Sequence, residues 1–304
     1  MPGKGSWEIM ISQVHGVLPN GSLEEGTVRL FEESHMPIFR KPRQHHAVVG
    51  SQLVSEVTFA RPQHAPPLVE KGTYDFAICG TDCVEETGAD VIVLAKLLYG
   101  RGNSTGETKV VLLAASNDSD CTSLETVRKG TRIISEYPNI TRKAFERVGT
   151  SVNISFSYGG TEAHIPKDYP IGVCVSDSGD SLRANYKKVV AVLFESCTAL
   201  IANKSAWEIK RDALTTLKHK LVGTLDARNS VFVCMNVPAK KMEWVLGQLP
   251  ALKKPTIAKL SGRNYFSVGT VIPKKEIETL MPRLLKGGVE GWVEMPITRV
   301  VQNW

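Results

Sequence analysis

The sequence of 304 residues lacks a long apolar run. No segment approaches the roughly 18 consecutive apolar residues that a membrane-spanning helix requires. The N-terminus is polar, and the apolar stretch at residues 9–11 is too short for the core of a signal peptide. These absences predict a cytoplasmic protein that has no membrane partner.

Cysteine is also scarce, with six residues scattered over the chain. Most of them lie in apolar, strand-like runs, where a reduced thiol behaves as a small hydrophobic side chain, so no disulfide is expected. Cys79 and Cys83 have a CxxxC spacing but no second pair and no nearby His, which favours a buried structural role over zinc ligation.

The positive charge is confined to the C-terminal part. From Lys218 onward there are 14 Lys or Arg and six Asp or Glu, so that the first 217 residues carry a net charge of −2 although the whole chain carries +6. The lysine pairs at 240–241, 253–254 and 274–275 are not interleaved with aromatic residues, as they would be in a single-strand binder. A solvated basic surface is favoured over a nucleic-acid site.

The bulk composition is that of a globular protein, with 42% hydrophobic and 22% charged residues. The chain is longer than one hydrophobic core usually supports, so two or three structural units are expected. In the first third, helical patterns at 24–33 and 65–70 alternate with strand patterns at 54–59 and 74–78, as in βαβ units. Gly80 and Asp82 directly follow the second strand, where open α/β sheets bind ligands; a simple turn fits equally well.

The middle of the chain predicts strands at 109–115, 131–135, 151–157, 171–176 and 189–194. A helix is predicted after Tyr137 and through Arg147, with Asn139 or Thr141 as its cap. Because the first amides of a helix lack partners, this junction could also hold an anion.

A second junction follows the strand at 171–176. It joins Gly179 to small polar residues, which present N–H and O–H donors to a phosphate without steric obstruction. The alternative is an ordinary helix start capped by Ser178 or Asp180. No Gly-Lys-Ser/Thr sequence is present, so the segment is not a Walker loop. The candidate phosphate-binding residues are Asp177, Ser178, Gly179, Asp180 and Ser181.

The C-terminal part predicts a compact unit of its own. A helix at 206–221 leads out of the preceding region, and strands at 230–237, 256–260, 265–272 and 291–300 alternate with helices at 240–249 and 275–285. The order is βαββαβ. Such ferredoxin-like units are frequent sensors of small ligands, although the fold alone does not give the function.

Seven segments of the sequence share their order and spacing with one known family: residues 18–23, 80–82, 135–141, 157–163, 177–185, 235–238 and 249–256. The chain therefore resembles ATP phosphoribosyltransferase of the long form. The resemblance implies an α/β fold, with a two-lobed, periplasmic-binding-protein-like catalytic region and a C-terminal ferredoxin-like (ACT-like) domain. It places catalytic lobe I at 1–115 and 190–217, lobe II at 116–189 and the regulatory domain at 218–304.

The family joins ATP and phosphoribosyl pyrophosphate to give phosphoribosyl-ATP and pyrophosphate, the first step of histidine biosynthesis. N1 of adenine attacks the anomeric carbon of the ribose as pyrophosphate leaves. The resemblance therefore implies catalysis by positioning, with Mg²⁺ neutralising the leaving group.

Carried over residue by residue, the resemblance gives each candidate a role. Residues 177–181 would hold the 5′-phosphate of phosphoribosyl pyrophosphate, and a group from the same lobe would line the cleft for the ribose or the nucleotide. Gly80 and Asp82 would border the cleft from the other lobe, and three residues would lie at the end of the first strand. The lining group is Glu136, Tyr137 and Glu162, and the first-strand group is Asn20, Gly21 and Ser22.

The resemblance also implies feedback inhibition by histidine. In βαββαβ modules, effectors usually bind between modules of neighbouring subunits, so a homo-oligomer between dimer and hexamer is expected. Ser261, Tyr265 and Thr270 are candidate effector contacts, although an ordinary role in loop and strand is equally compatible with these residues.

The sequence departs from the family pattern at three places. Cys174 stands where an acidic residue is usual before the phosphate loop, and a neutral thiol cannot replace the charge of a carboxylate. Asn20-Gly21-Ser22 replaces a frequent Lys-Gly-Arg, and His64 stands where Asp is common. The alternative to an active transferase is an impaired relative that acts as a nucleotide- or histidine-binding regulatory subunit. A solute-binding protein is a third reading, which the missing export signal disfavours.

Overall fold

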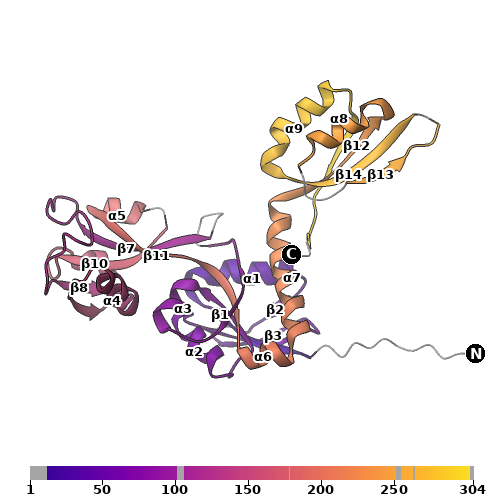
Figure 1. The fold of residues 1–304 in the computed structure, drawn as a ribbon. Helices are drawn as coiled ribbons and strands as arrows, with labels where there is room; N and C mark the ends of the chain where they lie inside the picture. The colour runs from indigo at the N-terminus through magenta and orange to yellow at the C-terminus, as the bar shows by residue number, and fades with distance from the viewer. Residues whose placement is uncertain (1–11, 101–105, 178, 251–254, 263, 302–304) are drawn as a thin grey trace, which may run out of the picture. The chain divides into compact units, whose positions relative to one another are not determined.

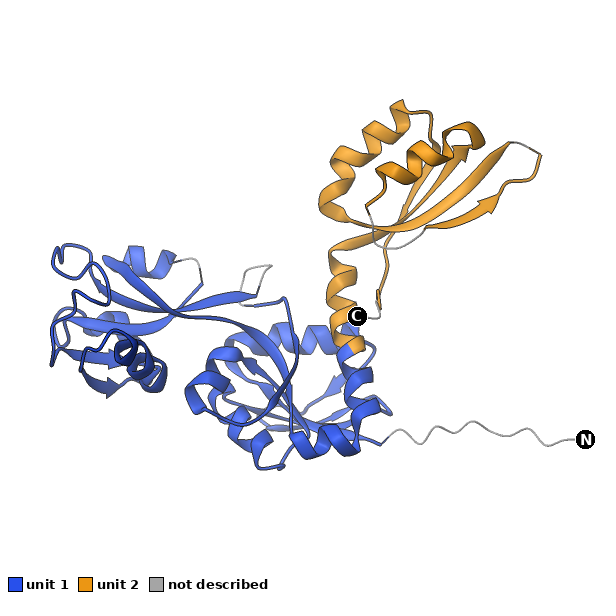
Figure 2. Ribbon diagram, viewed as in Figure 1, with its two compact units in different colours: residues 1–218 blue, residues 219–304 orange. Residues whose placement is uncertain are grey.

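The computed structural model describes residues 12–100, 106–177, 179–250, 255–262 and 264–301 (Figure 1). The chain forms two compact units, residues 1–218 and 219–304 (Figure 2). Unit 1 is an α/β region of two lobes, and unit 2 is a small sheet domain covered by helices.

The first lobe of unit 1 is built on parallel strands. β1 pairs in parallel with both β4 and β5, and every residue of β5 is buried, which explains its continuous apolar sequence. The predicted helices at 24–33 and 65–70 are confirmed residue for residue. The elements are β1 (Val14–Pro19), η1 (Gly21–Leu23), α1 (Glu24–Glu33), β2 (Ile38–Phe39), β3 (His46–Val49), β4 (Val54–Ala60), η2 (Pro62–His64), α2 (Ala65–Glu70), β5 (Phe76–Gly80), α3 (Thr81–Thr87) and β6 (Ile92–Lys96).

The second lobe has its own sheet and its own core. Its strand order is β11-β7-β10-β8-β9, and α4 packs its apolar face on the sheet, with Phe145 among Val110, Ile133 and Val173. The elements are β7 (Glu107–Ala115), β8 (Arg132–Ser135), α4 (Pro138–Arg147), β9 (Asn153–Phe156), η3 (Thr161–His164), β10 (Ile171–Ser176) and α5 (Asp180–Ala184).

One long strand connects the two lobes. β11 (Lys187–Ala202) pairs with β7 through its first part and with β5 and β6 through its last part. The prediction of a strand only at 189–194 was too short, because the polar pair Glu195-Ser196 interrupts an apolar pattern that resumes and continues to Ala202. β7 also pairs with β10, so strand pairing joins β7 to the second lobe, and the predicted lobe boundaries remain a proposal.

Two helices follow β11 where one was predicted. α6 (Lys204–Ile209) begins at Asn203, whose Oδ1 accepts a hydrogen bond from the Ala206 amide at 2.9 Å. α7 (Arg211–Arg228) starts directly after Lys210, which leaves the helical conformation and pairs with Asp75 at 2.8 Å. The break therefore coincides with a partly buried ion pair, which the hydrophobic pattern does not reveal.

Unit 2 has the predicted βαββαβ order. The antiparallel sheet runs β13-β14-β12-β15, and one core joins α8 and α9 to one face of this sheet (Figure 1). The last strand was predicted to reach residue 300 but ends at Met295, because Pro296 cannot donate a ladder hydrogen bond. The elements are β12 (Ser230–Pro238), η4 (Ala239–Lys241), α8 (Met242–Gln248), β13 (Thr256–Lys259), β14 (Tyr265–Pro273), α9 (Lys274–Lys286) and β15 (Glu290–Met295).

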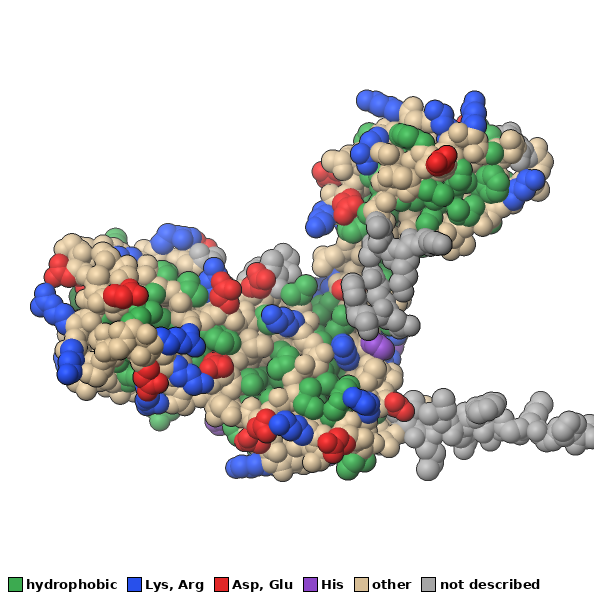
Figure 3. Space-filling view, in the orientation of Figure 1, with side chains coloured by type: hydrophobic (Ala, Val, Ile, Leu, Met, Phe, Trp, Pro, Cys, Tyr) green, Lys and Arg blue, Asp and Glu red, His purple; other side chains and the backbone are tan. Residues whose placement is uncertain are grey.

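Lys and Arg side chains of unit 2 lie mostly along its edge on the face in view, and a few acidic side chains lie on the same face (Figure 3). Within the part of the chain that the structure describes, no helix is both long and apolar enough to cross a bilayer. All six cysteines are free thiols, and five of them are buried.

Candidate active site

A cavity of about 390 Å³ lies in unit 1 and is lined from both lobes. Residues from the end of β5, from the start of α4 and from the segment after β10 meet there, although they lie far apart in the sequence. The structure thus brings together nine of the predicted site residues: Ser22, Gly80, Asp82, Tyr137, Glu162, Asp177, Gly179, Asp180 and Ser181.

Asp82 is the centre of a buried polar network. Tyr137 of the second lobe donates its hydroxyl hydrogen to Asp82 Oδ2 at 2.7 Å, and Ser196 of β11 donates to Asp82 Oδ1 at 2.5 Å. The amide of Asp82 in turn donates to Ser196 Oγ at 3.0 Å. Both carboxylate oxygens therefore have partners, which a buried carboxylate requires. The network holds the end of β5 against both the second lobe and the connecting strand.

Tyr137 is fixed from its backbone as well as from its ring. Its amide donates to Ser135 Oγ at 2.9 Å, and its carbonyl accepts a hydrogen bond from Thr141 Oγ1 at 2.7 Å. Burial, followed by the charge of Asp82, raises the pKa of the Tyr137 phenol far above its ordinary value. The phenol is thus a protonated donor at every physiological pH.

Glu162 and Cys174 line the cavity from the second lobe, and Glu136 lies close to both. Glu162 faces the cavity and accepts a hydrogen bond from Ser181 Oγ at 3.4 Å, whereas Glu136 is not among the cavity-lining residues and accepts from Thr161 Oγ1 at 3.0 Å. Burial raises the pKa of Glu136, and the charge of Glu162 adds to this. Cys174 lines the cavity, and burial together with these two charges raises the pKa of its thiol to about 12, so the thiol brings no charge.

The predicted phosphate loop borders the cavity between β10 and α5. Gly179 has a φ of +76°, a left-handed conformation that favours glycine, and it occupies the N-cap position of α5 in place of Ser178 or Asp180. Leu182 is buried with Val111, Leu113 and Ile165 and anchors the segment to the lobe. Ser178 lies outside the described residues.

The other candidates lie apart from the cavity. Asn20 and Gly21 are not among its lining residues, and the Asn20 amide donates to the Ala60 carbonyl at 2.9 Å. The effector candidates belong to unit 2. Ser261 is exposed in a turn, the Tyr265 hydroxyl donates to Glu290 Oε1 at 3.0 Å, and Thr270 is buried in β14.

Sequence reasoning missed the hydroxyl groups that β7 and β11 contribute. Thr108, Ser196 and Thr198 line the cavity, and Ser196 touches Asp82 directly. The available signal was the alternation of Ser196 and Thr198 within the apolar end of β11, since alternate residues of a strand face the same side. Gln63 and Cys197 are further lining residues that were not predicted.

The described cavity lining contains four carboxylates and no Lys, Arg or His. A phosphorylated substrate therefore needs cationic compensation from another source. No group of three or more His, Cys, Asp or Glu suited to a metal is found among the described residues. The carboxylates fit a Mg²⁺ ion that substrate phosphates hold in large part, because Mg²⁺ commonly uses one or two protein carboxylates together with phosphate oxygens.

Comparison with known proteins shows the family of the chain. A family model described as ATP phosphoribosyltransferase matches residues 61–223, and one described as HisG, C-terminal domain, matches residues 227–299. ATP phosphoribosyltransferase of Desulforudis audaxviator is 34% identical over 93% of this chain and 98% of its own length. The enzyme of Pelotomaculum thermopropionicum is 33% identical with the same coverage.

A solved structure is similar in fold. It is titled ATP phosphoribosyl transferase (HisG:HisZ) complex from Thermotoga maritima, and it aligns with a TM-score of 0.59 and 20% identity. The alignment covers 69% of this chain and 97% of that chain. The C-terminal unit has a family match of its own.

Proposed function

This chain belongs to the ATP phosphoribosyltransferase family, and we propose that the cavity of unit 1 is where it joins ATP to phosphoribosyl pyrophosphate. The observation that carries the proposal is the meeting of Asp82 and Tyr137 with Asp177 and residues 179–181 around one cavity. That arrangement provides a phosphate-binding segment on one side and a fixed hydrogen-bonding wall on the other. Release of pyrophosphate from the ribose needs this kind of positioning more than acid–base chemistry.

Each part of the cavity has a task in this proposal. The backbone around Gly179 and the Ser181 hydroxyl bind the 5′-phosphate, since Gly179 has no side chain to obstruct it. Glu162 and Tyr137 contact the ribose or the nucleotide, with Glu136 behind them as support. Gly80 and Asp82 bound the site from the first lobe, and Ser22 lies at its rim. Asn20 and Gly21 support the rim from the end of β1.

Mg²⁺ is part of the proposal because the described lining carries four carboxylates and no cationic side chain. Asp177 and Asp180 would supply protein oxygens to it. When bound, the ion neutralises the charge that develops on the leaving pyrophosphate. The protein's own residues then orient the ribose and the adenine ring.

Regulation and assembly are proposed on the same basis. We infer that histidine inhibits the enzyme through unit 2, with Ser261, Tyr265 and Thr270 as candidate contacts. A homo-oligomer between dimer and hexamer and a cytoplasmic location complete the proposal. The reading as an impaired regulatory subunit gains no support, because the named relatives match along 93% of the chain under the name of the enzyme itself.

An assay of pyrophosphate release with ATP, phosphoribosyl pyrophosphate and Mg²⁺, run with and without histidine, tests the proposal. We expect turnover that histidine suppresses. Absence of turnover in a folded protein that still binds ATP would reject the enzyme and favour the regulatory reading. Turnover that histidine does not change would reject only the proposed regulation.

The phosphate-loop assignment predicts the effect of Gly179→Val. An added Cβ would lie 3.3 Å from Arg183 Nη1 and would crowd the segment proposed to bind the phosphate, and the φ of +76° becomes strained. We expect the KM for phosphoribosyl pyrophosphate to rise at least about tenfold, with a smaller change for ATP. Gly149→Val is the matched control, because Gly149 has a φ of +69° but does not line the cavity. Equal KM values for phosphoribosyl pyrophosphate in wild type and Gly179→Val would reject the assignment.

A further inference from the structure

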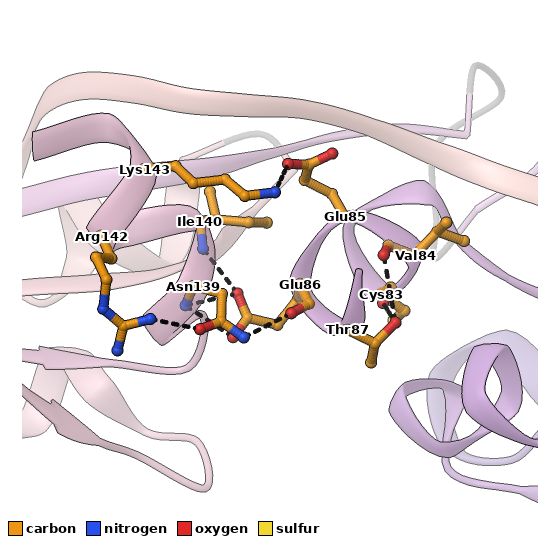
Figure 4. Close-up of polar contacts among 9 residues, drawn as sticks. All are labelled: Cys83, Val84, Glu85, Glu86, Thr87, Asn139, Ile140, Arg142 and Lys143. Atoms are coloured by element: carbon orange, nitrogen blue, oxygen red, sulfur yellow. Dashed lines mark hydrogen bonds and ion pairs between the residues drawn. The ribbon is translucent and has the colours of Figure 1, made fainter. Parts of the chain in front are cut away.

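The start of α4 is capped from the other lobe. Tyr137 occupies the N-cap position, and no side-chain hydrogen bond from it caps the helix. Glu86 of α3 takes this role instead (Figure 4). The Asn139 amide donates to Glu86 Oε1 at 2.9 Å and to Oε2 at 3.1 Å, and the Ile140 amide donates to Oε2 at 2.9 Å. The predicted caps, Asn139 and Thr141, are therefore wrong, because the sequence cannot show a partner 53 residues away.

The contact is specific to the two helices. Asn139 Nδ2 donates to the carbonyl of Glu86 at 2.8 Å, so the side chain predicted to cap α4 binds α3 instead. One turn further along, Lys143 Nζ lies 2.5 Å from Glu85 Oε1 (Figure 4). A carboxylate at a helix N-terminus is favourable because the unpaired amides and the helix dipole both attract it.

The same helix holds the cavity-lining part of Tyr137. Asp82 and Glu86 are four residues apart and lie on one face of α3. Asp82 accepts the hydrogen bond from the Tyr137 hydroxyl, and Glu86 caps the helix that begins directly after Tyr137. Tyr137 is therefore fixed at both ends by one face of α3, and this face sets the distance between the two walls of the cavity.

We propose that Glu86 is a positioning residue for the transfer reaction, which acts by capping α4 from the opposite lobe and thereby holding Tyr137 in the cavity wall. The inference depends on the proposed location of the substrates. Glu86 is not among the cavity-lining residues, so it does not act by touching them. Without the cap, the lobes and Tyr137 populate arrangements that do not bind substrate. The apparent affinity then falls in proportion to the fraction of molecules that remains in the binding-competent arrangement.

The first test compares Glu86→Ala, Glu86→Gln and Glu85→Ala in steady-state kinetics. For Glu86→Ala we expect the KM for at least one substrate to rise about tenfold while kcat changes less than about twofold, because saturating substrate restores the competent arrangement. Glu86→Gln keeps an acceptor oxygen but loses the charge, so its KM should rise only about threefold. Glu85→Ala is the matched control, because it removes the exposed ion pair between the same helices and leaves the cap in place.

The second test asks whether Glu86 acts through Tyr137. The effects of Glu86→Ala and Tyr137→Phe on KM should combine to much less than their product, because both loosen the same contact. Independent, multiplicative effects would overturn the proposal, as would KM values for a folded Glu86→Ala protein within about twofold of wild type. If Glu86→Ala does not fold, the same double-mutant cycle with Tyr137→Phe is measured with Glu86→Gln. Unchanged KM values in Glu86→Gln would also overturn the proposal.

The third test needs no activity. Amide hydrogen exchange at Asn139 and Ile140 in the substrate-free protein should become at least about tenfold faster in Glu86→Ala and remain unchanged in Glu85→Ala. Unchanged exchange at both amides would overturn the proposal. An inactive wild type would reject the proposed function, but the exchange measurement would still show whether Glu86 caps α4.

Discussion

At the residue scale, Cys174 shows how the cavity controls charge. Its side chain is buried, and the charges of Glu136 and Glu162 lie close enough to disfavour a thiolate further. The place that the family pattern reserves for an acidic residue is therefore electrically neutral in this protein. Negative charge at the cavity comes from Glu162 and Asp177, and from Asp180, which is paired with Arg183.

The Cys174 thiol predicts a loss of stability at alkaline pH. Its pKa is raised from an ordinary value of 9.0 to about 12, so between these limits the unfolded state loses a proton that the folded state keeps. Because the folded state then binds more protons, the free energy of unfolding should fall as pH rises above 9, by up to about 1.4 kcal/mol per pH unit for this thiol. More than about one unit below pH 9 the thiol is almost fully protonated in both states and has little effect.

Urea denaturation under reducing conditions from pH 8 to 10.5 measures this slope at intervals of about half a unit. Cys174→Ala should lose stability less steeply than wild type above pH 9, whatever its stability at neutral pH. The other cysteines are present in both proteins and cancel in the comparison. Parallel curves for the two proteins would contradict the prediction.

Single residues also show what the sequence could reveal of the site. Asp82, Tyr137 and Gly179 were predictable because each stands at a junction between a strand and a helix, and such junctions gather at one edge of a sheet. The contact between Ser196 and Asp82 was not predictable, because these residues are 114 positions apart in the sequence. The prediction of a local cap for α4 was wrong for the same reason, because the distant Glu86 accepts the hydrogen bonds of its first amides.

At the element scale, the junction of β5 with α6 and α7 depends on a buried carboxylate. Asp75 lies 2.9 Å from His15 Nδ1 and 2.8 Å from Lys210 Nζ, and it also accepts from the His15 amide at 3.0 Å. Lys210 separates α6 from α7, so the ion pair fixes where one helix ends and the next begins. One side chain thus satisfies polar groups of β1 and of the junction between α6 and α7.

Lys210→Met should lower the free energy of unfolding of unit 1 by about 2 kcal/mol, because a buried carboxylate loses a cationic partner while His15 remains. Lys204→Met is the matched control: Lys204 lies in α6 and pairs with Asp90, but both side chains are more than half exposed. That variant should change stability by less than about 0.5 kcal/mol. Equal effects of the two substitutions in chemical denaturation would contradict the assignment.

Elements with strong periodicity were predicted closely, and those determined by distant contacts were not. The alternation of β12 and the amphipathic pattern of α1 are local properties of the sequence. The length of β11 depends on pairing with three strands, two of them in the other lobe, and its polar pair Glu195-Ser196 lies where the strand passes between lobes. A local pattern cannot show that such a strand continues.

At the scale of the whole molecule, the two compact units divide the tasks. Unit 1 holds the cavity, and unit 2 has a core of its own that involves β12, β14 and both helices. Among the described residues, those that line the cavity all belong to unit 1, as do those of its hydrogen-bonding network. Inhibition by histidine bound to unit 2 would therefore be a coupling between two sites, which requires a difference in affinity between two states of the protein.

The candidate effector contacts make this coupling testable in the full chain. Tyr265 begins β14 and bonds to Glu290 at the surface of unit 2, whereas Thr270 alternates with Val268 and Ile272 and lies on the core side of the strand. We expect Tyr265→Ala to raise the histidine concentration for half-inhibition at least about tenfold, while kcat without histidine changes less than about twofold. Thr270→Val, which keeps the side-chain shape in the core, should have a smaller effect. A Tyr265→Ala enzyme that histidine inhibits as strongly as wild type would exclude Tyr265 from the effector site, and a larger effect of Thr270→Val would place that site on the helix-covered face of the sheet.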